Sequence, residues 1–210
     1  MGLLNIARNI INNQNICIMG IDGAGKTSTI MAISNILGPT TTVQYMGNKN
    51  WETKLGKEMK YFHSKYKIPT VIIKAVEFYY RVLKHYTSAN IVIYDRYVWE
   101  NVLNIESKYS KNIKFNLKKL LYKLIFIKLF PKPKYCFYLT CDLKTSIERK
   151  DDIDSKETIK ELERLKRIND EGFKNNKHIK IIDTDILSSE ETVYYILKNL
   201  PEKFLENSVN

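Results

Sequence analysis

The sequence predicts an α/β protein: one three-layer α/β/α domain around a five-stranded parallel sheet. Two observations indicate this class. Short apolar runs alternate along the chain with longer stretches of helical periodicity, which is typical of a parallel sheet covered by helices on both faces. The 210 residues, 44% of them hydrophobic, are enough for one sizeable core. We therefore expect a single domain over residues 1–210, with a tail over about residues 203–210.

Five apolar runs are expected to be the strands. Each is four to six residues long and rich in β-branched or aromatic residues, which favours a strand over a buried helix. The runs cover residues 15–19, 42–46, 91–94, 135–140 and 179–182.

Six longer stretches carry apolar residues at helical spacing and have recognisable ends. Gly38 ends the first, Pro69 begins the second and Pro131 ends the third. Ser188 followed by Glu191 forms a capping-box pattern at the start of the last. The predicted helices cover residues 27–37, 69–86, 116–130, 143–150, 156–173 and 188–197.

Composition and charge exclude several classes of protein. The apolar content excludes collagen-like and disordered chains, and no uncharged apolar run approaches the ~20 residues of a membrane span. The net charge of +11 fits a nucleic acid, an anionic membrane surface or a polyanionic small substrate as partner, and does not choose among them. Cys17, Cys136 and Cys141 form no C-x-x-C pair, so we expect core thiols in a reducing compartment. The first residues resemble neither a signal peptide nor a myristoylation signal, so a cytoplasmic location is expected by default.

Residues 20–27, Gly-Ile-Asp-Gly-Ala-Gly-Lys-Thr, match the phosphate-binding loop G-x-x-x-x-G-K-[ST] in full. A predicted strand precedes the loop and a predicted helix follows it, so backbone N–H groups would face phosphate oxygens at the positive end of the helix. Lys26 would bridge the β- and γ-phosphates, and the Thr27 hydroxyl would bind Mg²⁺. The sequence therefore predicts nucleoside triphosphate binding. The expected binding residues are Gly20, Asp22, Gly23, Ala24, Gly25, Lys26, Thr27 and Ser28.

Further segments carry a family resemblance. The loop contains a carboxylate, Asp22, and the strand at 91–94 runs into Asp95-Arg96-Tyr97. Looser matches follow in order at residues 131–142, 143–149 and 179–185. Together these segments resemble the thymidylate kinase group of nucleotide and nucleoside kinases. The resemblance implies a P-loop NTPase fold with strand order 2-3-1-4-5, phosphates at the carboxyl ends of the strands, ATP with Mg²⁺, and a lid over about residues 143–172.

The resemblance also implies roles for individual residues. Asp22 would accept a hydrogen bond from the acceptor's sugar hydroxyl, and Arg96 would hold the acceptor's phosphate. Asp95 would lie in the Mg²⁺ shell or near the attacking oxygen. Because Gly23 leaves the loop without an arginine, the lid must supply the transition-state cation, and Arg149 is the first choice. The implied catalytic residues are Lys26, Asp95, Arg96 and Arg149. Thr27 and Asp95 are the implied metal ligands, and Arg149, Asp183 and Asp185 would also contact ATP. Lys150 and Lys156, then Arg164 and Arg167, are the further lid cations.

The acceptor side departs from the family pattern. Residues 45–51 stand where the family commonly has an Arg-Glu-Pro segment, and residues 98–103 replace the small and polar residues beside thymine. Arg81, or Lys74 on the same predicted helix, would face the base, and Trp51 would stack on a base or a sugar ring. The expected acceptor-binding residues are Asp22, Trp51, Arg81, Arg96 and Tyr97.

Several functions stay open at this point. Thymidylate (dTMP) is the first small-molecule phosphate acceptor that the family implies, and another nucleotide or nucleoside, or a sugar hydroxyl of a glycan or glycolipid precursor, is the alternative. A non-catalytic ATP-binding regulator would keep the loop but show no acceptor-dependent turnover. A GTPase is disfavoured, because residues 48–51 carry tryptophan where the base-reading Asn-Lys-x-Asp motif needs aspartate.

Residues 107–141 contain nine lysines and no acidic residue. Leucines fall at helical spacing among them: Leu117, Leu120, Leu121 and Leu124. Three interpretations stay open: a domain helix with its apolar face on the sheet or at a homodimer interface, a peripheral contact with an anionic membrane through residues 111–134, and attraction of a polyanionic substrate. No nucleic-acid partner is expected, because no recognition motif accompanies the charge.

Overall fold

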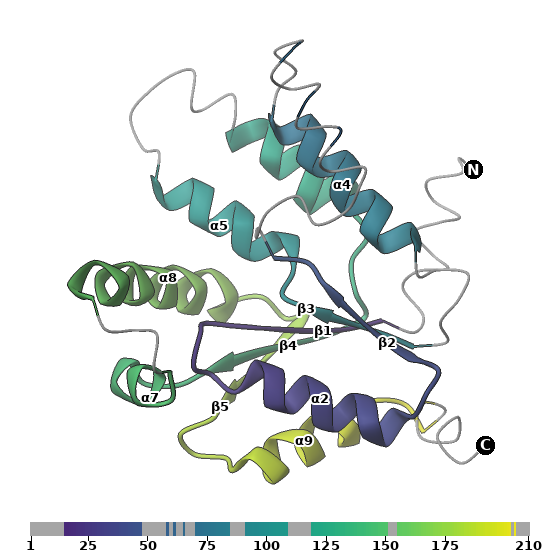
Figure 1. Cartoon of the computed structure of the whole chain (residues 1–210), viewed down its shortest axis with the longest axis vertical. Helices are drawn as coiled ribbons and strands as arrows, with labels where there is room; N and C mark the ends of the chain where they lie inside the picture. Colours follow the sequence, from purple (N-terminus) through teal and green to yellow (C-terminus); the bar gives the residue numbers. More distant parts are fainter. Residues whose placement is uncertain are drawn as a thin grey trace.

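The computed structural model of the chain describes residues 15–47, 58, 61, 65, 70–84, 91–108, 119–150, 155–202 and 204. Its centre is a five-stranded parallel sheet in the order β2-β3-β1-β4-β5 (Figure 1). The strands are β1 (Asn15–Gly20), β2 (Thr41–Tyr45), β3 (Ile91–Asp95), β4 (Tyr135–Thr140) and β5 (Ile179–Asp183). The predicted fold class and strand order are confirmed.

The strand register brings the functional segments to one edge of the sheet. Asp95, the last residue of β3, lies beside Ile18 of β1 on one side and Tyr45, the last residue of β2, on the other. Gly20, the last residue of β1, lies beside Leu139 of β4. Ligands of open α/β sheets bind beyond the carboxyl ends of the strands. The phosphate loop and the Asp-Arg-Tyr segment therefore meet where a ligand is expected.

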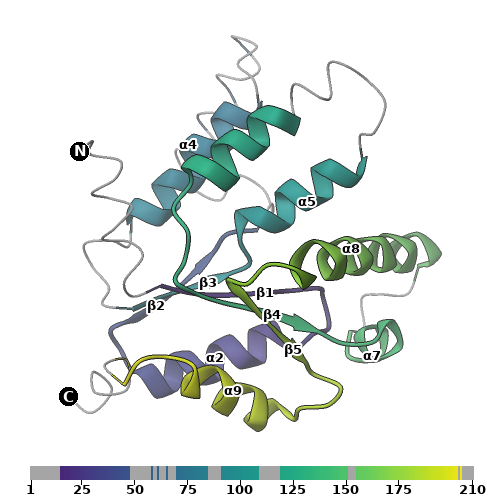
Figure 2. The ribbon, with the colours of Figure 1, turned by 180° about the vertical axis from the view of Figure 1, so that it is seen from behind.

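Helices cover both faces of the sheet. They are α2 (Lys26–Leu37), α4 (Thr70–Lys84), α5 (Val98–Lys108), the π-helix η1 (Lys123–Leu129), α7 (Leu143–Glu148), α8 (Lys156–Lys174) and α9 (Ser189–Lys198). Helices α2 and α9 lie against one face, and α4, α5 and η1 lie over the other, as the two opposite views show (Figures 1 and 2). The predicted capping box at the start of α9 is present between Ser188 and Glu191.

Alternation along β1 divides the core between these two faces. Cys17 and Met19 pack with residues of α4, α5 and η1, whereas Ile16 and Ile18 pack with residues of α2 and α9. All four side chains are fully buried, which is expected for a central strand of a parallel sheet. All three cysteines, at positions 17, 136 and 141, are buried and free, in agreement with the prediction of core thiols.

Helix α5 is absent from the sequence prediction, which treated residues 98–103 only as an acceptor-contacting segment. Val98 and Val102 are buried, and Ile105 packs against the same core cluster. The spacing of these three residues is the i, i+4, i+7 pattern of one helical face. The sequence therefore carried a helical signal between its polar residues.

The basic stretch differs from the prediction in its helix type and in the exposure of some leucines. Of the helix expected over 116–130, the structure describes the part from residue 119 onward, and residues 119–129 are helical. Lys123–Leu129 is a π-helix, and the Phe130 N–H directly after it donates to the Ile125 carbonyl oxygen at 2.8 Å. Phe126 and Phe130 are buried, whereas Leu120 and Leu124 are exposed. Aromatic side chains, together with Leu121 and Ile125, thus attach this segment to the domain.

No helix within the described ranges is both long enough and apolar enough to cross a membrane. The membrane contact through residues 111–134 and the homodimer stay predictions.

Candidate active site

The phosphate loop joins β1 to α2 and depends on glycine at two positions. Gly23 and Gly25 have φ angles of 82° and 80°, which lie in the left-handed region that favours glycine. At Gly23 a Cβ atom would lie 2.4 Å from the Ser146 carbonyl oxygen, so no side chain fits where α7 packs on the loop. At Gly25 the space is open, and α2 begins with the next residue. The loop therefore curls directly before a helix N-terminus, as phosphate binding requires.

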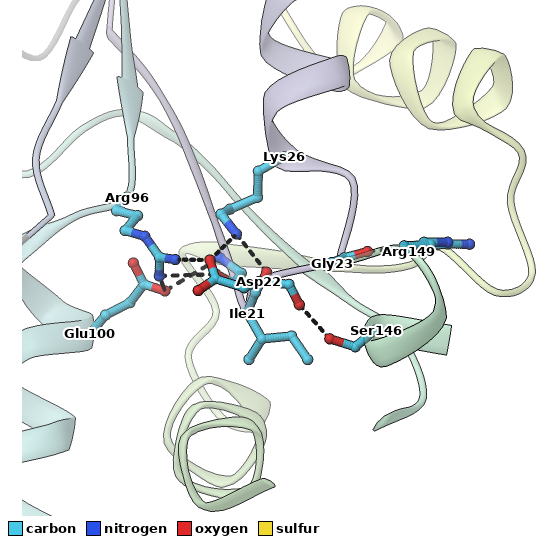
Figure 3. A network of polar contacts seen from close by, with 9 residues as sticks. Ile21, Asp22, Gly23, Lys26, Arg96, Glu100, Ser146 and Arg149 are labelled. Carbon is cyan, nitrogen blue, oxygen red and sulfur yellow. Dashed lines mark hydrogen bonds and ion pairs between the residues drawn. The ribbon is translucent and has the colours of Figure 1, made fainter. Parts of the chain in front are cut away.

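Lys26 is buried at the start of α2 and turns back over the loop (Figure 3). Its Nζ donates to the Ile21 carbonyl oxygen and lies 3.7 Å from Asp22 Oδ1. Burial, together with the nearby Arg96 charge, lowers the pKa of Lys26 to about 8, although Asp22 and Glu100 act in the opposite direction. An anionic ligand at this place would stabilise the charged form of the lysine.

Arg96 directly follows β3 and reaches across to the loop (Figure 3). Its Nη2 lies 2.5 Å from Asp22 Oδ1, and its Nη1 donates to the Gly20 carbonyl oxygen at 3.2 Å. The backbone of Arg96 is left-handed with φ 67°, a conformation that costs a non-glycine residue about 1–2 kcal/mol. Burial lowers the pKa of Arg96, but Glu100 and Asp22 together raise it above its ordinary value. The guanidinium is therefore a fixed positive charge.

A second carboxylate, Glu100 of α5, lies against the same guanidinium. Glu100 Oε1 is 3.5 Å from Arg96 Nη1 and accepts the Gly20 N–H at 3.4 Å. Burial raises the pKa of Glu100 above its ordinary value, although Arg96 and Lys26 act in the opposite direction. The sequence analysis gave Glu100 no role, although it lies only four residues after Arg96.

Two cavities meet at this cluster. The first, of about 390 Å³, is lined by Asp22, Gly23, Gly25, Lys26, Thr27, Ser28, Tyr45, Asp95, Arg96, Arg149 and Lys150. The second, of about 320 Å³, is lined by Ile21, Asp22, Tyr45, Gly47, Arg96, Tyr97, Glu100, Asn101, Asn104, Leu162, Leu165 and Asn169. We call them the loop cavity and the α5 cavity. Asp22, Tyr45 and Arg96 line both, so groups bound in the two cavities would meet there.

Arg149 follows α7 and spans the loop cavity and the segment after β5. Its Nη1 donates to Thr184 Oγ1 and its Nη2 to the Thr184 carbonyl oxygen, both at 3.0 Å, and Nη1 is 3.5 Å from the Gly23 carbonyl oxygen. Asp185 lies 3.9 Å from Arg149 and accepts the Asp142 N–H, the main cause that lowers the pKa of Asp185. These contacts hold Arg149 beside the phosphate loop.

Contacts outside the sequence prediction also shape the loop. The Ser146 hydroxyl of α7 donates to the Asp22 carbonyl oxygen, and Ser146 is fully buried (Figure 3). Thr184 fixes Arg149, as described above. Both residues lie in the looser family matches at residues 143–149 and 179–185, but nothing in the sequence indicated these contacts, because each joins segments far apart along the chain. Three asparagines of the α5 cavity, Asn101, Asn104 and Asn169, were also given no role, although Asn101 lies in the acceptor segment 98–103.

Most of the predicted site residues come together in the structure. The loop residues, Asp95, Arg96, Arg149 and Lys150 line the loop cavity, and Asp22, Arg96 and Tyr97 line the α5 cavity. Gly20 and Ala24 belong to the loop but do not line either cavity. The Asp183 carboxylate accepts the Asp185 N–H at 2.9 Å, and both lie outside the two cavity linings.

The other cations predicted for the lid and for the acceptor side line neither cavity. Arg81 is buried, with its Nε 3.0 Å from Glu77 Oε1, and its Nη1 donates to the carbonyl oxygens of Tyr45 and Gly47 at 3.3 and 3.4 Å. It supports the wall of the α5 cavity without lining it. Arg164 pairs with Glu161, its expected helix-surface partner, and also donates to Asn104 Oδ1 at 2.7 Å. Lys74, Lys156 and Arg167 line neither cavity, and Trp51 lies outside the described residues.

The residues suggested for Mg²⁺ fit this ion. Thr27 and Asp95 line the same cavity, and they offer a hydroxyl and a carboxylate oxygen. Mg²⁺ prefers oxygen ligands and is typically held by one or two protein groups plus the phosphates of the substrate. Among the described residues no cluster of three or more His, Cys, Asp or Glu side chains forms a metal site of its own. A nucleotide would therefore bring most of the ligands.

The family follows from a match across most of the chain. The family model described as Thymidylate kinase matches residues 18–194, which include the loop, the Asp-Arg-Tyr segment and Arg149. The chain belongs to the thymidylate kinase family. It is accordingly an ATP-dependent phosphotransferase of the nucleotide and nucleoside kinase type, and this family uses ATP with Mg²⁺. The match confirms the resemblance drawn from the motifs.

Solved structures share the fold of this thymidylate kinase family member. A thymidylate kinase from Candida albicans is 19% identical, with a TM-score of 0.67 and coverage of 94% of each chain. A deoxyadenosine kinase from M. mycoides with bound dATP is 20% identical, with a TM-score of 0.61 and coverage of 89% of this chain and 98% of that one. The same enzyme with bound dCTP is 17% identical, with a TM-score of 0.56 and coverage of 89% and 100%. No curated protein sequence matches the chain.

Proposed function

We propose that this chain transfers the γ-phosphoryl group of ATP to a nucleoside or a nucleoside monophosphate, with ATP in the loop cavity and the acceptor in the α5 cavity. The observation that carries the proposal is the meeting of the two cavities at Asp22 and Arg96. Phosphoryl transfer needs mainly positioning and neutralisation of charge. A cation held at the junction of two cavities supplies both.

The described side chains would have separate roles in phosphoryl transfer. Lys26 and Arg149 line the loop cavity and would neutralise the transferring phosphoryl group, while Arg96 stands at the junction. Mg²⁺ bound with ATP at Thr27 and Asp95 would supply further charge neutralisation. A bond forms between the acceptor oxygen and the γ-phosphorus, the bond from that phosphorus to the β–γ bridging oxygen breaks, and ADP leaves with that electron pair. Where the acceptor is a hydroxyl, Asp22 would take its proton.

The structural neighbours support nucleosides and nucleoside monophosphates as the acceptors. One neighbour is a thymidylate kinase and the other a deoxyadenosine kinase, so dTMP and deoxynucleosides are the first acceptors to test. The function as a kinase rests on the family, and the choice of acceptor rests on the α5 cavity.

The test is ADP release by the purified chain with Mg-ATP across a panel of acceptors. The panel holds dTMP, other nucleoside monophosphates, the matching nucleosides and simple sugars, with a blank that lacks acceptor. We expect ADP release above the blank with at least one nucleoside or nucleotide. Release only with sugars, or ATP binding with no acceptor-dependent release, would overturn the proposal.

A further inference from the structure

The α5 cavity carries an acidic side chain that the proposed chemistry does not use. Glu100 enters from the first turn of α5, and only 8% of the residue is exposed. Its Oε1 faces Arg96 and the Gly20 N–H, while its Oε2 is buried and has no hydrogen-bond partner among the described residues. A buried carboxylate is costly, so its presence in a ligand cavity calls for a reason.

The charges of the α5 cavity do not favour a phosphate. Among its described lining residues, Asp22 and Glu100 are acidic and Arg96 is the one basic residue. Arg96 is already engaged by both carboxylates, at 2.5 and 3.5 Å. A monophosphate in this cavity would have to share that guanidinium with two carboxylates, and like charges at such distances repel by several kcal/mol.

Within the described ranges, two further arginines near the α5 cavity do not line it. Arg81 lies behind the cavity wall in an ion pair with Glu77, and Arg164 is paired with Glu161. Lys26 lines the loop cavity and not the α5 cavity, although its Nζ lies 3.7 Å from Asp22 Oδ1.

We propose that the acceptor is an unphosphorylated nucleoside, which reacts through a hydroxyl, and that Glu100 excludes nucleoside monophosphates from the α5 cavity. This inference rests on the proposed function and narrows it to one substrate class. A neutral acceptor adds no charge beside the two carboxylates. A hydroxyl acceptor must lose a proton when it attacks, and a carboxylate can accept that proton. A phosphate oxygen attacks without losing one.

The remaining polar groups of the cavity suit an uncharged ligand. Asn101 Nδ2 and Asn169 Oδ1 are buried, and neither atom has a hydrogen-bond partner among the described residues. Both side chains line the α5 cavity. An amide donor and an amide acceptor match the polar edge of a nucleobase and carry no charge. The cavity thus offers hydrogen bonds for a base and carboxylates near the site of transfer.

The inference is tested by matched pairs of acceptors with the full-length protein at saturating Mg-ATP and pH 8. We would compare kcat/KM for thymidine against dTMP and for deoxyadenosine against dAMP. For the wild-type chain we expect the nucleoside to exceed its monophosphate by at least about tenfold in the better pair, given the cost of like-charge contacts. A preference for the monophosphate in the better pair would overturn the inference while leaving the kinase proposal intact.

A variant then assigns the preference to Glu100. Glu100→Gln keeps the shape and the acceptor oxygen for Gly20 but removes the charge, and we expect the nucleoside-to-monophosphate ratio to fall by about tenfold, mainly through a lower KM for the monophosphate. Glu171→Gln, a neutralised carboxylate on the exposed side of α8, controls for net charge and should keep the wild-type ratio. A ratio unchanged in Glu100→Gln would overturn the role of Glu100.

Two further outcomes are informative. If Glu100→Gln does not fold, the wild-type ratio still decides which class of acceptor is used, and Glu100→Asp, which keeps the charge, should retain the nucleoside preference. If the wild-type chain phosphorylates neither member of any pair, the proposed kinase function fails and this inference fails with it.

Discussion

Asp22 Oδ1 lies 2.5 Å from Arg96 Nη2 and 3.7 Å from Lys26 Nζ. One carboxylate oxygen thus connects the cation that follows β3 with the cation of the phosphate loop. Because Asp22 and Arg96 line both cavities, this contact lies where the donor and the acceptor would meet.

Replacement of Arg96 by alanine tests this junction. It leaves the buried Glu100 carboxylate without its guanidinium, so we expect the free energy of unfolding to fall by about 1–3 kcal/mol. We also expect the acceptor KM to rise by about tenfold and more than the KM for ATP, because Asp22 loses the group that orients it. Urea unfolding and steady-state kinetics measure the two effects. Equal changes in both KM values would place Arg96 outside the junction.

A double variant separates stability from binding. Addition of Glu100→Gln to Arg96→Ala removes the unpaired charge, so it should recover part of the lost stability without restoring the acceptor KM. If the double variant is less stable than Arg96→Ala alone, the ion pair between Arg96 and Glu100 is not the source of the stability loss.

The pKa of Lys26 predicts a pH dependence of ATP binding. Burial lowers this pKa to about 8, so the free protein holds a charged lysine below pH 8 and a neutral one above it. Bound phosphates favour the charged form, so ATP binding above pH 8 should take up a proton, and affinity should fall as pH rises, by up to about tenfold per pH unit. Calorimetry at pH 7 and pH 9, in buffers of different ionisation enthalpy, measures the proton uptake. Lys26→Met should abolish the difference between the two pH values, and a difference that persists in this variant would assign the proton to another group.

Two glycines of the loop provide a matched comparison. Gly23 and Gly25 have nearly the same positive φ, but only Gly23 would place a Cβ against the Ser146 backbone. Gly25→Ala should therefore cost only the left-handed strain of about 1–2 kcal/mol. Gly23→Ala should cost about 1–3 kcal/mol more, because the loop or α7 must shift. Thermal unfolding of both variants measures the difference, and equal losses would contradict the described packing of α7 on the loop.

Arg149 is expected to act in the chemical step. Arg149→Ala should lower kcat by about a hundredfold or more, because one transition-state cation is lost. Lys144→Ala is the control, since Lys144 is exposed on α7, the helix that Arg149 directly follows, and lines neither cavity. Single-turnover kinetics would compare the two variants. A fall in kcat of the same size in both would show that the effect comes from α7 and not from the guanidinium.

The fold was predictable because its signals are local. Each strand is a short apolar run, and the phosphate loop is one contiguous motif, so the loop cavity could be assembled from residues 20–28, Asp95, Arg96 and Arg149. The α5 cavity depends on contacts between segments far apart in the sequence. Asn169 of α8 and Asn101 of α5 line the same cavity although they are far apart in the sequence, and no spacing in the sequence predicts this.

Packing also decided the cases in which the prediction was wrong or incomplete. Leu120 and Leu124 have the periodicity of a packed helical face but are exposed, whereas Phe126 of the π-helix and Phe130 directly after it are buried. Arg81 has the charge expected of a base-contacting residue, but its guanidinium pairs with Glu77 and donates to backbone carbonyl groups. Charge and periodicity identify such residues, but their partners are set by the tertiary structure.

The central claim is phosphoryl transfer between the two cavities, and the most direct measurement follows the phosphate itself. The purified chain would be incubated with Mg-ATP labelled at the γ-phosphate and with thymidine, deoxyadenosine or dTMP, and the products separated by chromatography. We predict labelled nucleotide product with the wild-type chain and none with Lys26→Ala, which removes the buried cation of the phosphate loop. Label that stays in ATP, or appears only as inorganic phosphate, would contradict the account.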